Sequence, residues 1–218
     1  MKKILCVTYR SWATNIYNSL NEALPDYDFK IINTKEDFEL SMVYDFNPDL
    51  ILWYGWSWIV PDEIIDKYIS LCLHPSPLPK YRGGSPIQNQ IINGEKISAV
   101  TVFKMGKGLD DGDIISQLPF SLEGDIKDIF KRMSDLGFSA TFDIITKGYL
   151  LKRQDHTKAT AFKRRKLKDS EITIDEIQTK SAEYLHNKIR MLTDPYPNAY
   201  IKCNDGKKLY ITKSHYHD

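Results

Sequence analysis

The first candidate for chemistry in this chain is His74, which follows an apolar run over residues 68–73 and begins a proline-rich stretch, residues 75–79. Histidine can exchange a proton near neutral pH. The prolines exclude a helix and keep the backbone extended. Gly83-Gly84 then permits a close turn, and Ser85-Pro86 is typical of a helix start. A single histidine beside such a turn is more often structural, so its interpretation depends on its partners.

A second candidate is the acidic pair Asp110 and Asp111. It lies in a turn-rich segment, residues 106–112, between two β-type runs at 98–105 and 113–120. This pattern predicts a β-hairpin with a long, functional tip. A carboxylate close to an imidazole favours the protonated ring, which can donate a hydrogen bond. A solvated pair of turn residues is the alternative, and spacing alone leaves the two open.

Together these segments resemble the formyltransferase family that uses 10-formyltetrahydrofolate. The matching residues are His74-Pro75-Ser76, then 78–83, then 108–114, and the similarity extends from residue 1 to about residue 215. The family's Asn falls on Cys72, which cannot supply an amide hydrogen bond. Two long motifs at the family's spacing are a specific signal.

The resemblance implies catalytic roles for His74 and Asp110. Formyl transfer to an amine is an acyl transfer, which needs a donor for the developing oxyanion and a group that takes the amine proton. Because Cys72 lacks an amide, we expect Asn89, or failing that Gln88, to point its amide toward His74. The alternative for both is a polar residue on a helix surface.

We expect two further sets of contacts, one to the folate donor and one to the acceptor, and we expect no bound metal. Aromatic residues after the third strand suit a flat pterin, although packing under a loop is the commoner role of a single Trp. Arg10 and Ser11, at a predicted helix start, suit an anionic group, with an exposed Arg as the equal alternative. The folate set is Tyr54, Trp56, Trp58, Gly108, Leu109 and Asp111, and the acceptor set is Arg10, Ser11, Ser76, Tyr81, Arg82 and Gly83.

The elements that position these residues alternate between strand and helix. The pattern predicts an α/β fold, an open, mostly parallel, twisted sheet with helices on both faces, Rossmann-like as in the formyltransferases. A small C-terminal helix and β-hairpin follow. We expect a catalytic domain at 1–153, a linker at 154–175 and a subdomain at 176–218. The basic run at 163–168 is interpreted as solvated, with phosphate or RNA contact as the alternative.

Composition limits the function classes. The chain has 218 residues, 42% of them hydrophobic and 27% charged, and a net charge of +1, so neither nucleic acid nor a membrane is an expected partner. Three cysteines with no paired spacing indicate a reducing, cytoplasmic location. No run approaches transmembrane length.

The expected acceptor is the amine of a nucleotide-linked amino sugar, as in polysaccharide biosynthesis. Residues 190–200 resemble the segment that leads into a barrel in methionyl-tRNA formyltransferases, and we expect room for a hairpin only. A short methionyl-tRNA formyltransferase, a formyltetrahydrofolate hydrolase and a catalytically impaired folate-binding protein remain alternatives. The sugar enzymes of the family suggest a homodimer, with the hairpin as its candidate surface.

Overall fold

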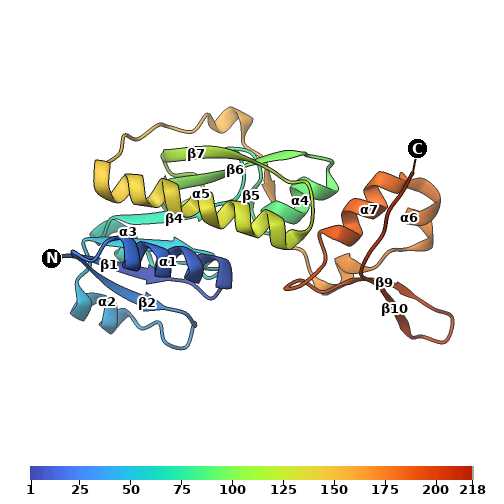
Figure 1. The fold of residues 1–218 in the computed structure, drawn as a ribbon, viewed down its shortest axis with the longest axis horizontal. Helices are drawn as coiled ribbons and strands as arrows, with labels where there is room; N and C mark the ends of the chain where they lie inside the picture. Colours follow the sequence, from blue (N-terminus) through green and yellow to red (C-terminus); the bar gives the residue numbers. More distant parts are fainter. Residues whose placement is uncertain (218) are drawn as a thin grey trace.

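A six-stranded sheet organises the computed structural model, which describes residues 1–217 (Figure 1). The strand order is β2-β1-β3-β4-β6-β7. The first four of these strands are parallel to one another, whereas β6 runs antiparallel to β4 and to β7. The bounds are β1 Lys2–Val7, β2 Tyr27–Ile32, β3 Leu50–Tyr54, β4 Ser70–His74, β6 Ile97–Lys104 and β7 Ile114–Ser121. The mostly parallel α/β fold predicted from the sequence is confirmed.

Alternation along the strands divides the core between the two faces of the sheet. In β1, Ile4 and Cys6 belong to one apolar cluster, and Leu5 and Val7 to another. Helices α1 (Ser11–Ala23) and α5 (Ile126–Lys147) cover the first face, and α2 (Leu40–Phe46) and α3 (Asp62–Lys67) cover the second (Figure 1). Buried strands with both faces covered therefore present their ends, rather than their faces, to solvent.

Close packing fixes α5 on the sheet. A Cβ on Gly137 of α5 would lie 2.7 Å from the end of the Ile16 side chain and 2.8 Å from that of Leu73, so the glycine lets α5 approach α1 and β4 without displacing them. Helix α4 (Pro86–Ile92) follows the proline-rich loop and starts at Ser85, which has φ 52°.

The C-terminal third is more structured than the sequence indicates. The expected linker contains the short strand β8 (Ala161–Phe162), which pairs with β5 (Arg82–Gly83), and two 3₁₀ turns, His156–Lys158 and Leu167–Ser170. The small C-terminal helix that the sequence predicts is two helices, α6 (Ile174–Thr179) and α7 (Ala182–Arg190), because Ser181 caps α7 through the backbone N–H of Tyr184.

The final hairpin, β9 (Ala199–Lys202) and β10 (Lys208–Ile211), is antiparallel as predicted. Its buried Ala199, together with Met191 and Leu192, joins the apolar cluster that includes α1 and α5. The C-terminal segment thus packs on the sheet domain, at the end opposite the N-terminus in Figure 1. The division into a catalytic domain, a linker and a subdomain stays a prediction. No helix within residues 1–217 has the length and apolar character to cross a membrane.

Candidate active site

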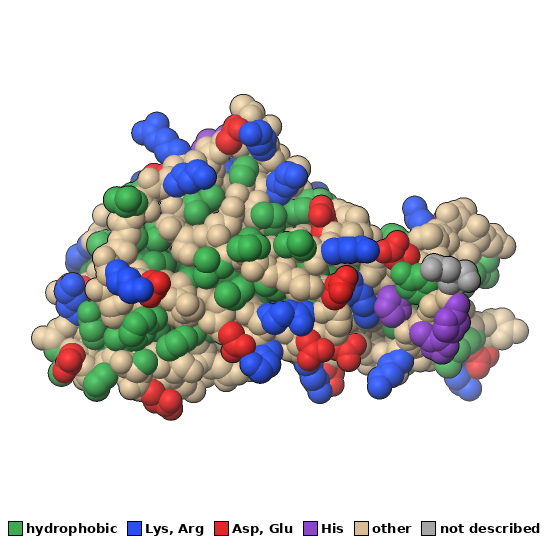
Figure 2. Space-filling view, turned by 45° about the horizontal axis from the view of Figure 1, so that its top comes forward, with side chains coloured by type: hydrophobic (Ala, Val, Ile, Leu, Met, Phe, Trp, Pro, Cys, Tyr) green, Lys and Arg blue, Asp and Glu red, His purple; other side chains and the backbone are tan. Residues whose placement is uncertain are grey.

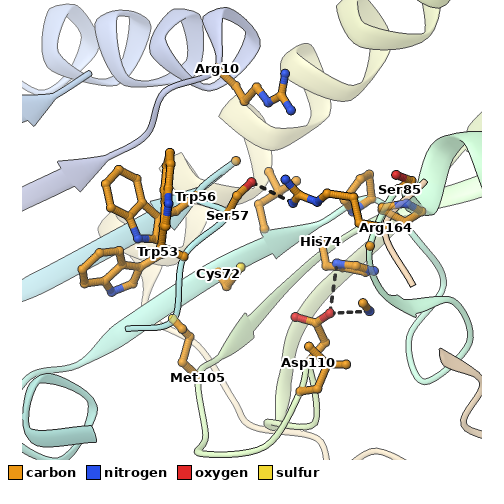
Figure 3. Close-up of a pocket in the computed structure, with 18 of the residues that line it drawn as sticks. Arg10, Trp53, Trp56, Ser57, Cys72, His74, Ser85, Met105, Asp110 and Arg164 are labelled. Atoms are coloured by element: carbon orange, nitrogen blue, oxygen red, sulfur yellow. Dashed lines mark hydrogen bonds and ion pairs between the residues drawn. The ribbon is translucent and has the colours of Figure 1, made fainter. Parts of the chain in front are cut away.

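A cavity of about 780 Å³ opens where β1, β3 and β4 end, beside the loops that follow them (Figure 3). Carboxyl ends of parallel strands meet at one edge of the sheet, where such folds bind ligands. His74 and Asp110 lie in its wall, with tryptophans across the cavity and Arg164 beside them (Figure 3).

His74 is the last residue of β4 and is 6% exposed. Its Nε2 lies 2.7 Å from the carbonyl oxygen of Tyr81, and since a carbonyl only accepts, Nε2 donates there. Nδ1 lies 3.5 Å from Oδ2 of Asp110. The Tyr81 carbonyl therefore fixes the ring and leaves the Nδ1 edge for Asp110 and a ligand.

Asp110 sits at the tip between β6 and β7 with φ 47°, a left-handed conformation that Asp tolerates better than most residues. Its Oδ2 also accepts a hydrogen bond from the backbone N–H of Gly83 at 2.8 Å. The amide of Gln154, a buried residue, donates to the carbonyls of Asp110 at 2.9 Å and Gly112 at 2.7 Å. These contacts hold the tip against the proline-rich loop.

Cys72 lines the cavity on the same face of β4 as His74. Burial raises the pKa of its thiol well above the ordinary value, and the nearby Asp110 adds to this, so the group is a neutral thiol. The amide of Asn89 does not replace the missing donor, because its Nδ2 donates to the carbonyl of Gly84 at 2.9 Å and Asn89 lies behind the cavity wall. Gln88 does line the cavity, and its Nε2 has no partner among the described residues.

The aromatic side of the cavity is formed by Trp53, Trp56 and Trp58 with Met105. The rings of Trp56 and Trp58 lie 4.6 Å apart between centroids. Tyr54 is a correction to the expected folate contacts. It is fully buried on the opposite face of β3, and its hydroxyl forms a hydrogen bond with Thr141 in α5, because strand alternation turns it into the core.

The basic side combines residues from three loops. Arg10 follows β1, Ser57 follows β3, and Arg164 follows β8, and all three line the cavity. Arg164 donates to Ser57 Oγ at 2.8 Å, and the hydroxyls of Ser57 and Tyr9 lie 2.5 Å apart. The interpretation of the basic run as merely solvated is corrected for Arg164, because pairing of β8 with β5 brings it to the cavity.

Among the other expected contacts, Gly83, Gly108 and Leu109 line the cavity, whereas five residues lie outside it and shape its loops. Ser11 is exposed at the start of α1. Ser76 donates to the Lys80 carbonyl and Tyr81 to Glu95, and Arg82 donates to Gln154 and contacts His156. The carboxylate of Asp111 packs beside Gly108, where an added Cβ would lie 2.0 Å away.

Sequence reasoning missed several residues of the cavity. Trp53 lies within an apolar strand, where a core role is expected. Ser57 lies between two tryptophans that are the more obvious candidates for a ligand contact. Phe162 and Tyr196, which line the cavity, and Gln154, which holds the Asp110 tip, carry no local signal, since each reaches the site through contacts distant in sequence. The basic run at 163–168 was the only available hint for Arg164.

Comparisons with known proteins show which family the chain belongs to. The profile of a family described as "Formyl transferase" matches residues 23–143. The chain belongs to the formyl transferase family. A solved structure named methionyl-tRNA formyltransferase, from Clostridium thermocellum, is 32% identical with a TM-score of 0.85, and 97% of each chain is covered.

Two further proteins are similar to this chain. A methionyl-tRNA formyltransferase from Ehrlichia chaffeensis is 31% identical over 187 residues, which cover 84% of this chain and 59% of that protein. The chain therefore spans less than two thirds of this curated relative. A sugar N-formyltransferase structure from a Shewanella species is 20% identical with a TM-score of 0.78, covering 100% of this chain and 99% of that one, and shows the shared fold.

Proposed function

We propose that the protein transfers the formyl group of 10-formyltetrahydrofolate to the amine of a nucleotide-linked amino sugar. One observation carries the proposal. The pair formed by His74 and Asp110 lines a cavity that also has an aromatic and a basic side, so that two different substrates can meet there (Figure 3). No group of three or more metal-ligating side chains occurs within residues 1–217.

The folate donor supplies the formyl carbon. Residues of the chain accept the amine proton and stabilise the negative charge that develops. Asp110 accepts the proton that the amine loses when its nitrogen bonds to the formyl carbon. His74, protonated on Nδ1, donates to the formyl oxygen as negative charge develops there. When the bond from that carbon to N10 of the folate breaks, the proton held at this pair passes to N10. The Tyr81 carbonyl and the Gly83 N–H keep both groups oriented.

The tryptophan side suits the pterin of the donor, because flat rings pack well on aromatic side chains. The arginine side suits an anionic acceptor such as a nucleotide sugar. On the face shown in Figure 2, Lys and Arg are interspersed with Asp and Glu rather than gathered into one basic surface. This face therefore lacks the continuous basic surface that a long polyanion requires.

A second candidate acceptor is methionyl-tRNA. Its support is the 32% identity to the Clostridium thermocellum chain of that name, which is aligned over nearly its whole length. Both candidates use the same donor and the same pair, and they differ in what the basic side binds.

The test is a mass-spectrometric assay with 10-formyltetrahydrofolate and, in parallel, a panel of amino-sugar nucleotides and methionyl-tRNA. We expect an added formyl group on a sugar amine. Product on methionyl-tRNA alone would support the second candidate. Formate released without an acceptor would indicate a hydrolase, and folate binding without any product would indicate a protein that has lost catalysis.

A further inference from the structure

Positive charge is concentrated at one end of the cavity without compensation. Arg10, Lys163 and Arg164 line this end, and none of them has an acidic partner within residues 1–217. The contrast is Lys107 at the other end, whose ammonium lies 2.9 Å from Asp66. In a chain with a net charge of only +1, this local excess calls for an anionic ligand.

Neighbouring residues fix the position of the Arg10 side chain and leave its hydrogen-bond donors available. Its guanidinium lies 4.4 Å from the centroid of the Tyr9 ring and points into the cavity (Figure 3). A Cβ on Gly55 would lie 2.9 Å from the Arg10 side chain, so the glycine makes room for it. The guanidinium has no hydrogen-bond acceptor among the described residues. Its planar fork of donors is therefore available to a ligand.

Arg164 reaches the same place from the opposite side through a rigid backbone path. The N–H of Gly84 donates to the carbonyl of Phe162 at 2.8 Å, and the N–H of Arg165 donates to Ser85 Oγ at 3.1 Å. A Cβ on Gly84 would lie 2.4 Å from the Arg164 backbone. Among the described residues its guanidinium donates to Ser57 only, which leaves most of its donors for a ligand.

The positive charges of the two arginines act on the pKa values of neighbouring tyrosines. Partial burial opposes ionisation of Tyr9, yet its hydrogen bond with Ser57 and the charges of Arg10 and Arg164 lower its pKa overall. Burial raises the pKa of Tyr196, and the nearby side chain of Gln88 and the charges of the same two arginines act against that rise. Gln88, 3% exposed, brings an amide nitrogen without a described partner to the same wall. Cations, hydroxyls and an amide thus converge from separate loops.

We propose that Arg10 and Arg164 together bind the phosphate or diphosphate group of the amine-bearing substrate. Guanidinium groups pair with phosphate oxygens through two parallel hydrogen bonds, and two of them can hold a diphosphate from both sides. The assignment of this anion to the acceptor rests on the proposed function. The glutamate carboxylates of a folate share the anionic chemistry, and the experiment separates the two sources.

The experiment measures binding of UDP, inorganic pyrophosphate, 5-formyltetrahydrofolate and an RNA oligonucleotide to the full chain by calorimetry. Arg10→Gln and Arg164→Gln are compared with Lys166→Gln, a matched control that removes an exposed cation of the same basic run outside the cavity. We expect each arginine change to weaken UDP and pyrophosphate binding by about tenfold, because one bidentate pair is lost. Lys166→Gln should change UDP and pyrophosphate binding by less than about twofold. Each arginine change should alter the affinity for 5-formyltetrahydrofolate by less than about twofold.

Several results would overturn the assignment. These are unchanged UDP binding in both arginine variants, a loss that falls on the folate analogue instead, or binding only of an RNA oligonucleotide with no UDP binding. The measurement needs no turnover, so its failure is distinct from failure of formyl transfer. Arginine-dependent UDP binding in a protein without transfer would support the anion site and refute the proposed reaction.

Discussion

Oδ2 of Asp110 accepts a hydrogen bond from the backbone N–H of Gly83 at 2.8 Å and lies 3.5 Å from Nδ1 of His74. The two segments that match the family motifs are thus joined by one carboxylate oxygen. Asp110 has both a structural contact, to the loop, and a chemical one, to the ring. A useful variant must remove the charge and keep the contact.

Asp110→Asn does this, because the amide oxygen can still accept from Gly83. We expect turnover to fall by about 10²–10⁴-fold, the usual contribution of an acid–base group, with folate affinity within about threefold of the wild type. Steady-state kinetics and calorimetry measure the two effects. Asp111→Asn is the control, since Asp111 packs beside Gly108 outside the cavity. A damaging Asp111→Asn with a benign Asp110→Asn would show that the motif is misplaced by one residue.

A second prediction concerns Cys72, whose thiol stands where the family has an amide. Cys72→Asn should introduce a donor next to His74 and raise the turnover number by up to about 10²-fold, the usual worth of one oxyanion donor. The control is Cys72→Ala, which removes the thiol and adds no donor. Pre-steady-state measurement of the transfer step should separate them. Equal turnover in the two variants would mean that the oxyanion is stabilised elsewhere, with Gln88 the next residue to test.

A third prediction tests the approach of the 161–165 segment to Gly84. A Cβ there would meet the Arg164 backbone at 2.4 Å, so Gly84→Ala should displace the segment, cost about 1–3 kcal/mol of unfolding free energy and raise the KM for the acceptor. Gly94→Ala is the comparison, because its Cβ would meet nothing within 4 Å and only its φ of 79° is unfavourable. It should cost about 1 kcal/mol and leave KM unchanged. Urea unfolding and kinetics measure both, and equal KM values would contradict the prediction.

A fourth prediction follows from Cys6, whose thiol is fully buried with a pKa raised well above 9.0 by burial. Above pH 9 the thiol ionises in the unfolded chain but not in the folded one. The free energy of unfolding should therefore be unaffected below pH 9 and fall by about 1.4 kcal/mol per pH unit for this group above it.

Cys6→Ala should reduce that slope between pH 9 and 11, even if the small cavity it creates lowers stability at every pH. Chemical denaturation at a series of pH values gives the slope. Cys203→Ala, at an exposed cysteine, should keep the wild-type slope. A slope that Cys6→Ala leaves unchanged would show that other groups, such as the buried Tyr17, govern the alkaline loss.

The sequence by itself determined the parallel strands of this protein and the position of its histidine at a strand end. Apolar runs with glycine and proline boundaries predict the parallel strands, and the position of His74 at a strand end follows from that pattern. The two motifs predict the pairing of His74 with Asp110. These features depend on neighbours along the chain, and local patterns record them directly.

Tertiary structure alone decided which side chains enter the cavity. Alternation along β3 turns Tyr54 into the core and Trp53 toward the site, and the αL start of α4 leaves the Asn89 amide on the Gly84 carbonyl. Arg164 reaches Ser57, 107 residues away, only because β8 pairs with β5. From sequence alone, a run of charged residues is expected to be solvated, because its neighbours along the chain do not show which distant segment it will pack against.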